Sequence, residues 1–198
     1  MNLKGKRIIL ASGSPRRREL LAGMNIEFTV DTENSFEERY DPSTPHEQIP
    51  ALMSEGKSHG FHRELEENEI LITSDTMVLC HSTAPDGSPI LGKPHGREDA
   101  IGMLKRLSGT DHEVITAVTI RDRNRTITRS DSTIVTFKPL TDSEIDYYID
   151  NCLPFDKAGA YGIQEWIGYI GITGIRGSYF NVMGFPTHLV YEMLLSFL

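Results

Sequence analysis

The sequence predicts an α/β protein built on a mixed β-sheet with flanking helices. Short apolar runs with strand character alternate along the chain with stretches whose apolar residues recur at helical spacing. Two further strand-like runs, residues 114–120 and 125–137, are joined by a short polar turn. Because a purely parallel sheet contains no adjacent hairpin, this pair predicts a mixed sheet. The 198 residues contain no internal repeat and no low-complexity linker, so we expect a single domain over residues 1–198.

The chain is expected to open with a strand, a turn and a helix. Residues 7–11 form an apolar run typical of a buried strand, and a Gly-Ser turn ends it. Ser14 is a favourable N-cap and Pro15 a favourable first helical residue. The apolar residues of the following stretch, residues 16–24, recur at helical spacing, which predicts the first helix.

A second helix is expected over residues 45–60. Thr44 and Glu47 stand at the spacing of a capping box. Pro50 interrupts this stretch and predicts either a kink or a later start of the helix. Residues 70–81 then form a strong strand candidate, although a polar segment interrupts it.

Turn and capping signals predict the remaining elements. Within the glycine-rich stretch, residues 161–164 are expected to be a loop. These elements are a hairpin tip at Asp86 and Gly87, a helix over residues 97–107 closed by Gly109, a helix from the capping box of Thr141 and Glu144 to Cys152, the glycine-rich stretch over residues 158–177, and a final helix over residues 187–197.

Composition and charge exclude several classes of protein. A hydrophobic fraction of 38% with 24% charged residues excludes a mainly disordered chain. The formal net charge of −8 argues against broad nucleic-acid binding, which needs a basic face. Cys80 and Cys152 lie too far apart in the sequence to suggest a disulfide framework, and no apolar run reaches the length of a membrane span. We therefore expect a cytoplasmic protein that binds neither nucleic acid nor membranes.

The segment Ser-Gly-Ser-Pro-Arg-Arg at residues 12–17 is the first candidate site. Where a strand ends and a helix begins, unpaired backbone N–H groups and the helix dipole favour an anion. Ser12 adds a hydroxyl, and Arg16 and Arg17 add forked donors that suit phosphate oxygens. The alternative is a solvated basic helix start. Arginines in a first helical turn oppose the dipole without a structural return, which favours the anion site.

Asp75, in the polar segment of the expected strand over residues 70–81, is the second candidate. A carboxylate within an apolar strand needs a partner, because burying it uncompensated is costly. A metal, a water or an arginine would serve, and the alternative is an aspartate at a strand end that bonds nearby backbone. Together with Glu37 or Glu38, Asp75 could hold Mg²⁺, which takes one or two carboxylates plus phosphate and water.

Two lysines and a glutamine give weaker signals. Lys57 and Lys93 are each candidates for contacting phosphate, although most lysines are merely solvated. Residues 87–93 match most of a P-loop, but Pro94 stands where the magnesium-binding Ser or Thr belongs, so we reject a Walker motif. Gln164 lies in the glycine-rich stretch, where its amide could read the edge of a base.

Together these segments resemble the Maf family of nucleotide pyrophosphatases. The matching pieces fall in the order of the family and cover nearly the whole chain. They are Ser-Gly-Ser-Pro-Arg-Arg at residues 12–17, Ser-Asp-Thr at 74–76, Gly-Lys-Pro at 92–94, Leu-Ser-Gly at 107–109 with His112 and Thr116, Lys-Ala-Gly-Ala-Tyr-Gly-Ile-Gln at 157–164, and Gly-Ser-Tyr-Phe-Asn-Val-Met-Gly-Phe-Pro at 177–186.

The resemblance implies an elongated mixed sheet whose flanking helices form two lobes around a cleft, as in inosine-triphosphate pyrophosphatases. It also implies a homodimer and a metal-dependent hydrolase that uses Mg²⁺ or Mn²⁺. The reaction would split a nucleoside triphosphate between its α- and β-phosphates, giving the monophosphate and pyrophosphate. The Tyr-Gly-Ile-Gln form of the motif at residues 161–164 resembles the subgroup that acts on dTTP, UTP and related pyrimidine nucleotides.

The resemblance also implies roles for single residues. Asp75 would be the catalytic carboxylate that activates water directly or through the metal, while Lys57 and Lys93 neutralise the triphosphate. The acidic metal ligand beside Asp75 falls on Glu37 or Glu38, and we favour Glu38. The substrate-binding residues would be Ser12, Arg16, Arg17 and Gln164.

The sequence departs from the family pattern at several points. Glu165 and Trp166 replace the glycine that commonly follows the glutamine, which puts the base preference in doubt.

Two other functions are alternatives to this enzyme. One is a nucleotide-binding regulator of cell division that uses the same pocket without turnover, but a sensor has no need of a water-activating carboxylate. The other is a nucleic-acid-binding module resting on residues 16–18, which the acidic balance disfavours.

Overall fold

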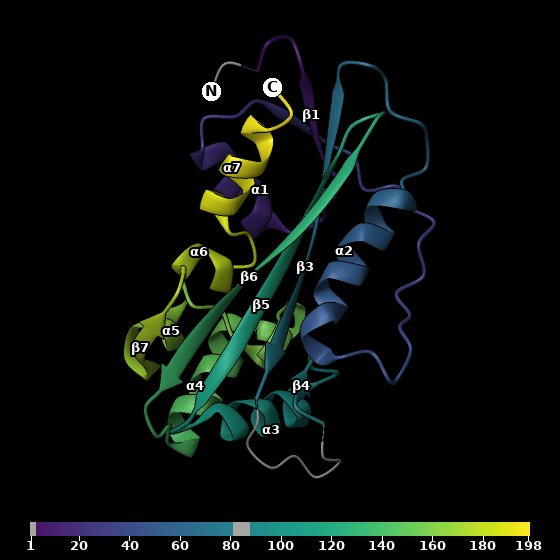
Figure 1. The fold of residues 1–198 in the computed structure, drawn as a ribbon. Helices are drawn as coiled ribbons and strands as arrows, with labels where there is room; N and C mark the ends of the chain where they lie inside the picture. Colours follow the sequence, from purple (N-terminus) through teal and green to yellow (C-terminus); the bar gives the residue numbers. More distant parts are fainter. Residues whose placement is uncertain (1–2, 81–87) are drawn as a thin grey trace. The chain divides into compact units, whose positions relative to one another are not determined.

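The computed structural model describes residues 3–80 and 88–198. A seven-stranded β-sheet runs through it (Figure 1). Its strands are β1 (Arg7–Leu10), β2 (Phe28–Val30), β3 (Glu69–Leu79), β4 (Ile90–Leu91), β5 (Asp111–Arg121), β6 (Thr126–Phe137) and β7 (Ile172–Arg176). The order is β2-β1-β3-β5-β6-β7, and β4 pairs with β3. Strand β1 pairs in parallel with β2 and β3, whereas β3 with β4 and β6 with β7 are antiparallel, so the predicted mixed sheet is confirmed.

Seven α-helices accompany the sheet in the described part of the chain. They are α1 (Pro15–Gly23), α2 (Ile49–His59), α3 (Arg97–Leu107), α4 (Asp142–Cys152), α5 (Trp166–Gly171), α6 (Tyr179–Val182) and α7 (Thr187–Leu195). Short 3-10 helices occupy His46–Gln48, Pro154–Asp156 and Ala158–Ala160. None of the described helices combines the length and the apolar character that a bilayer crossing requires.

The chain divides into two compact units, each assembled from separated stretches of sequence. The first unit comprises Met1–Asp75, Thr116–Asp131 and Gly184–Leu198. The second comprises Thr76–Ile115 and Ser132–Met183. Strand β3 therefore begins in the first unit and ends in the second, and the boundary follows Asp75 directly.

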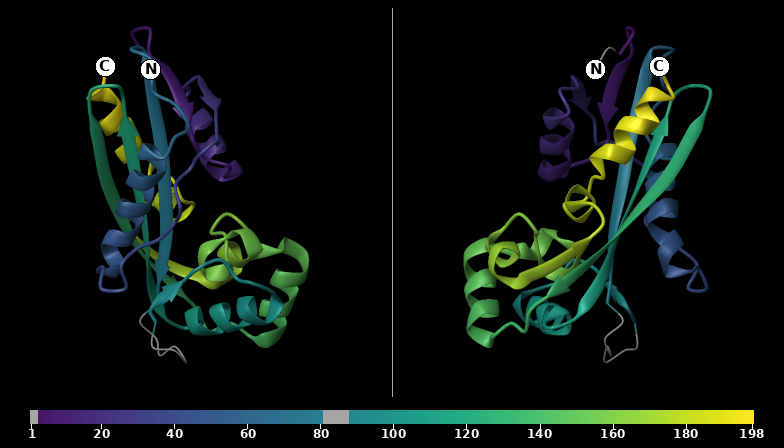
Figure 2. Two further views of the ribbon diagram at one scale, coloured as in Figure 1. Left: turned by 90° about the vertical axis from the view of Figure 1, so that its right-hand side faces the viewer. Right: turned by 60° about the vertical axis from the view of Figure 1, so that its left-hand side comes forward.

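The first unit contains the parallel part of the sheet. The chain runs from β1 through α1 to β2 and then through α2 to β3, on the other side of β1. Because parallel crossovers are right-handed, these two connections place α1 and α2 on opposite faces of the strands, as Figures 1 and 2 show. Part of the core of this unit is a cluster of Ile9, Leu71, Phe61 and Leu65, each at most 6% exposed.

The second unit contains helices α3 to α6 together with β4, β7 and parts of β3, β5 and β6. Arg97 at the start of α3 forms ion pairs with Asp146 and Asp150 on α4, and Lys105 pairs with Asp142. At the start of α4 the predicted capping box is confirmed, because Thr141 Oγ1 accepts from the Glu144 backbone and Glu144 Oε2 accepts from that of Thr141.

The second helix begins later than residue 45. A 3-10 turn, His46–Gln48, precedes α2, which starts at Ile49, and no side chain caps it. The predicted capping box of Thr44 and Glu47 is therefore wrong. Pro50 lies in the first turn of α2, where its missing N–H would have no helical partner in any case, so of the two alternatives the later start is correct.

Two other predictions for local structure have different outcomes. Asp86 and Gly87, the expected hairpin tip, lie outside the described residues. Residues 161–164 form a loop as predicted, and the rest of the glycine-rich stretch contains α5 and β7, which the sequence did not predict. Gly168 weakens the helix signal of α5 in the sequence. A β-carbon there would lie 1.8 Å from the Ile163 carbonyl oxygen, so tight packing selects glycine inside this helix.

Candidate active site

Three predicted site residues meet at one ammonium group in the first unit. Lys57 Nζ lies 2.6 Å from Asp75 Oδ1 and 2.8 Å from Glu38 Oε1. The side chains of Lys57 and Asp75 are 22% and 18% exposed, so this ion pair is partly shielded, whereas that of Glu38 is 62% exposed. The cluster therefore has a sheltered half and a half open to solvent.

Asp75 reaches this cluster from the interior of β3. Thr73 and Ser74, which precede it in the polar segment, are both buried, and Thr73 Oγ1 donates to the Ser54 carbonyl of α2 at 2.7 Å. Asp75 is thus not an aspartate at a strand end, and its partner is a lysine, which was not among the partners expected from the strand pattern alone. An α2 side chain and a β3 side chain meet here because α2 packs on this strand.

The side chains of Glu37 and Glu38 form ion pairs with different partners. Glu37 pairs with Arg39 at 3.0 Å, and both side chains are largely exposed. Glu38 instead contacts Lys57, which brings it to the side chain that Asp75 also contacts. Of these two glutamates, Glu38 is thus the one that shares a contact with Asp75, while its role as a metal ligand stays a prediction.

The two carboxylates of this cluster are ligands of the kind that a divalent cation takes. Glu38 and Asp75 converge on the Lys57 ammonium, and both also act electrostatically on the nearby Arg17 guanidinium. Mg²⁺ typically takes one or two protein carboxylates and completes its shell with water and phosphate oxygens. Among the described residues no group of three or more His, Cys, Asp or Glu could hold a metal ion alone. Glu38 and Asp75 therefore fit a metal that is shared with a phosphate ligand.

The turn before α1 adds a hydroxyl to the same unit, and the first turn of α1 adds two arginines. Ser12 is buried, and its Oγ accepts from the Ser14 backbone at 3.3 Å and from Arg17 Nη1 at 3.4 Å. Ser14 is the N-cap residue of α1 but makes no side-chain capping bond. Arg16 is half-buried in the first turn, where the dipole favours anions.

Arg17 is engaged mainly by the protein backbone. Its Nη1 donates to the Ser74 carbonyl at 2.7 Å, and its Nε donates to the Gly184 carbonyl at 2.9 Å. Burial lowers the pKa of the Arg17 guanidinium to about 10, while the nearby Asp75 carboxylate acts in the opposite direction. The guanidinium thus joins three segments of the first unit, a role that its sequence motif did not reveal.

Lys93 and Gln164 belong to the second unit. Lys93 is exposed and directly follows Gly92, whose carbonyl accepts from the Gly159 backbone at 3.0 Å. Gln164 lies in a tight turn closed by a hydrogen bond of 3.0 Å from the Glu165 backbone N–H to the Gly162 carbonyl. Its Oε1 is buried without a hydrogen-bond partner among the described residues. A buried acceptor left without a donor is what a ligand amide would satisfy.

A buried network that the sequence did not reveal holds the turn of Gln164. Glu165 accepts a short hydrogen bond from the Tyr148 hydroxyl and forms an ion pair of 3.0 Å with Lys157. The Gly162 backbone N–H donates to the Tyr148 oxygen at 3.0 Å. Burial, followed by the bond to Glu165, raises the pKa of Tyr148 far above its usual value, so this hydroxyl stays protonated and keeps donating.

His112 and Tyr161 form a second anchor beside that turn. His112 Nε2 lies 2.7 Å from the Tyr161 hydroxyl, and both rings pack against Phe137. Burial lowers the pKa of His112 to about 4, with the Asp111 carboxylate opposing this shift. His112 is therefore neutral near pH 7. Its match to the family pattern gave no indication of this packing role.

These features define an α/β protein with a helix start that carries two arginines and a carboxylate pair suited to a cation. A comparison with family models identifies which group of such proteins it is: residues 7–197 match the model described as Maf-like protein. The chain belongs to the Maf family.

Relatives in several bacteria are similar over almost their whole length. A protein of Porphyromonas gingivalis strain W83 is 44% identical over 99% of this chain and 96% of its own. One of Flavobacterium johnsoniae is 47% identical over 97% and 95%, and one of Phocaeicola vulgatus is 47% identical over 98% and 97%. Each is named dTTP/UTP pyrophosphatase. Among solved structures, that of the Staphylococcus aureus Ham1 protein matches 67% of this chain and 72% of its own, with a TM-score of 0.43 and 12% identity.

Proposed function

We propose that this protein hydrolyses dTTP and UTP to the nucleoside monophosphate and pyrophosphate with the help of Mg²⁺ or Mn²⁺. The observation that carries the proposal is the convergence of Glu38 and Asp75 on Lys57 Nζ. Relatives at 44–47% identity over nearly full length, all named dTTP/UTP pyrophosphatase, support the choice of reaction. They also favour an enzyme over a nucleotide-binding regulator without turnover.

The reaction joins one water to the nucleotide. The water oxygen bonds to the α-phosphorus while the bond from that phosphorus to the bridging oxygen of the β-phosphate breaks. Pyrophosphate leaves with that oxygen, and the monophosphate retains the base. Asp75 accepts the proton of the attacking water, since it is the more sheltered of the two carboxylates and is held by Lys57 at 2.6 Å.

The remaining residues offset the negative charge of the triphosphate. Ser12 lies in the turn before α1 and Arg16 in the first turn of α1, where oriented N–H groups and an arginine fork suit phosphate oxygens. Arg17 supports this turn through its backbone bonds and adds a positive charge. Lys57 contributes its ammonium beside Asp75, and Lys93 serves as a further cationic contact.

Glu38 and Asp75 would hold the divalent cation. A bound Mg²⁺ or Mn²⁺ would supply positive charge to the phosphate oxygens and polarise the attacking water. Lys57 already balances one of the two carboxylate charges, so the pair accepts a cation most favourably when phosphate oxygens complete its shell.

Gln164 would contact the nucleobase. Its buried Oε1 lacks a partner among the described residues, and it can accept a hydrogen bond from the ring N–H that thymine and uracil share. A cytosine base has no N–H at that ring position, so this single contact would distinguish thymine and uracil from cytosine.

We also propose that the protein is a cytoplasmic homodimer. Light scattering coupled to gel filtration would test the oligomeric state.

A panel of nucleoside triphosphates tests the proposed reaction. The purified protein is incubated with canonical and modified nucleotides and with Mg²⁺, Mn²⁺ or a chelator, and both pyrophosphate and monophosphate are measured. Pyrophosphate release that is strongest with dTTP or UTP and absent with the chelator is the expected result. Release of inorganic phosphate, or tight binding without turnover, would contradict it and favour another hydrolase or the regulator.

A further inference from the structure

The ion pair of Glu38 with Lys57 is partly exposed to solvent and does not by itself hold the Glu38 segment in place. The Glu38 side chain is 62% exposed, and an exposed ion pair such as its contact with Lys57 gives little stability by itself. The segment around it has no helix or strand to hold it, since Glu38 lies between β2 and the 3-10 turn before α2. Some other feature must hold this segment against α2.

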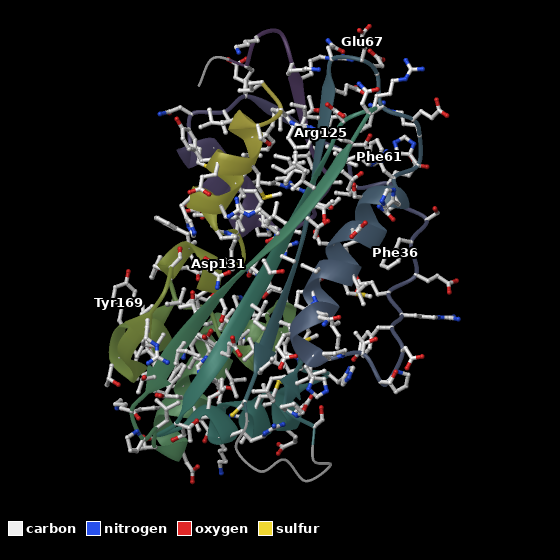
Figure 3. All side chains as sticks on the ribbon, in the orientation of Figure 1. Phe36, Phe61, Glu67, Arg125, Asp131 and Tyr169 are labelled. Carbon is white, nitrogen blue, oxygen red and sulfur yellow. The ribbon has the colours of Figure 1, made fainter. Side chains whose placement is uncertain are left out.

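Phe36 is that feature. It is half-buried, whereas Ser35 and Glu37 on either side are exposed, and it lies beside α2 in Figure 3. A β-carbon on Gly56 of α2 would lie 2.2 Å from the ring of Phe36, and one on Gly60 would lie 2.6 Å from the Phe36 β-carbon. Gly60 directly follows the last residue of α2 and is four residues from Gly56, so the two glycines lie on the same side of the helix end. The two glycines therefore form the surface on which Phe36 rests.

Hydrogen bonds made by Asn34 and Ser35 fix the register of this contact. The Ser35 N–H donates to the Gly60 carbonyl at 2.9 Å, and the Asn34 side-chain amide donates to the Lys57 carbonyl at 2.6 Å. Asn34 Oδ1 in turn accepts from the Phe36 N–H at 2.8 Å. The segment is thus bound to the turn of α2 that carries Lys57.

The anchor limits where Glu38 can go. Two residues of extended chain span about 7 Å at most, so a fixed Phe36 keeps the Glu38 backbone near Lys57, which directly follows Gly56. We propose that Phe36 and Gly56 are positioning residues that hold Glu38 in place as a metal ligand. This inference rests on the proposed function, because it takes Glu38 as one of the two carboxylates that bind the cation.

Gly56→Ala is the variant that separates this role from a merely structural one. Alanine is a better helix former than glycine, so the change favours α2 itself. Its β-carbon nevertheless occupies the place of the Phe36 ring, which must leave. Gly102→Ala is the matched control, because Gly102 lies inside α3 and a β-carbon there meets no atom within 4 Å.

Binding of Mn²⁺ is measured by electron paramagnetic resonance with an α,β-imido analogue of dTTP, which is not split. We expect Gly56→Ala to raise the Mn²⁺ dissociation constant at least about tenfold, as loss of a ligand's support typically does, without lowering the melting temperature. Phe36→Ala should raise the Mn²⁺ dissociation constant by a similar factor, because it removes the other partner of the same contact. In the Phe36→Ala background, Gly56→Ala should have no further effect, since the ring that it displaces is absent.

Limited trypsin cleavage after Arg39 gives a readout without metal. We expect faster cleavage in Gly56→Ala and Phe36→Ala, wild-type rates in Gly102→Ala, and wild-type rates in Glu38→Gln, which loses the ligand but keeps the anchor. If Gly56→Ala and Phe36→Ala bind Mn²⁺ like the wild type while Glu38→Gln does not, the inference is overturned and the metal assignment stands. If Glu38→Gln also binds Mn²⁺ normally, the metal assignment fails, and the inference fails with it.

Discussion

Arg17 donates a hydrogen bond of 2.7 Å to the backbone carbonyl of Ser74, the residue directly before Asp75. A second bond from Arg17 reaches the Gly184 carbonyl at 2.9 Å. The helix start that carries the arginines is thereby tied to the strand that carries the catalytic candidate. A lysine could replace the charge of Arg17 but not both of these directed donors.

Two neighbouring arginines should therefore respond differently to the same change. Arg17→Gln is expected to lower the free energy of unfolding by about 1–3 kcal/mol, because two largely buried carbonyls lose their donor. Arg16→Gln should leave stability within about 0.5 kcal/mol and raise KM for dTTP about tenfold, since Arg16 lies in the first turn of α1. Urea unfolding and steady-state kinetics measure the two effects. Equal stability of both variants would show that Arg17 is not a structural clamp.

Asp75→Asn should remove turnover while leaving nucleotide binding largely intact. Asparagine keeps the shape of the side chain but cannot take a proton from water, and a lost general base costs about 10²–10⁴-fold in kcat. The affinity for the α,β-imido analogue of dTTP, measured by calorimetry, should change much less than kcat. Loss of binding and activity together, in a variant that unfolds at the wild-type temperature, would argue against a proton-accepting role.

Tyr148→Phe should loosen the turn that carries Gln164. The change removes the hydroxyl that donates to Glu165 and accepts from the Gly162 N–H, so we expect a loss of about 1–3 kcal/mol in unfolding free energy. KM for dTTP should rise severalfold with little change in kcat. Tyr147→Phe is the control, because Tyr147 is 50% exposed and its ring contacts that of Trp166 at a tilted angle. A Tyr148→Phe protein as stable as this control would contradict the prediction.

His112 should make stability fall as the pH is lowered below about 6.5. Burial lowers the pKa of His112 from 6.5 to about 4 in the folded protein, so between these values the unfolded chain binds a proton that the folded chain does not. The contribution is fully present above the unfolded pKa and declines as the pH falls toward 4, by roughly 3 kcal/mol in all. Depressed carboxylates such as Glu69 act mainly below pH 4.5, outside most of this window.

His112→Gln separates this titration from the others. Glutamine cannot titrate, so the slope of unfolding free energy against pH between about 5 and 6.5 should be smaller than in the wild type, whatever the stability of the variant at pH 7. The same slope in both proteins would mean that another group is responsible. Guanidinium unfolding at closely spaced pH values gives the comparison.

Sequence reasoning identified most of the fold because the strong patterns are local. The capping box of Thr141 and Glu144 and the apolar run before Ser12 each depend on neighbours in the chain. The elements that were missed depend on packing instead. Helix α5 contains Gly168, which is required by the approach of the Ile163 carbonyl, and no periodic pattern reports such a contact.

The site shows the same division. The sequence pointed to Asp75 as a carboxylate in need of a partner, and the resemblance pointed to Lys57, but neither showed that one ammonium would contact both Asp75 and Glu38. The network of Tyr148 and Lys157 around Glu165 was not visible either, because residues far apart in the sequence form it. Distances between such side chains follow from the tertiary structure alone.

The position of Lys57 between two carboxylates also bears on how the protein rests when no nucleotide is bound. The Lys57 ammonium lies between Glu38 and Asp75 and offsets their mutual repulsion, so we expect the fold to be stable without metal. Chelation should abolish activity without unfolding the protein, and added Mg²⁺ should restore activity within the time of mixing. Such a protein would stay folded but inactive while metal is scarce and would regain activity without new synthesis.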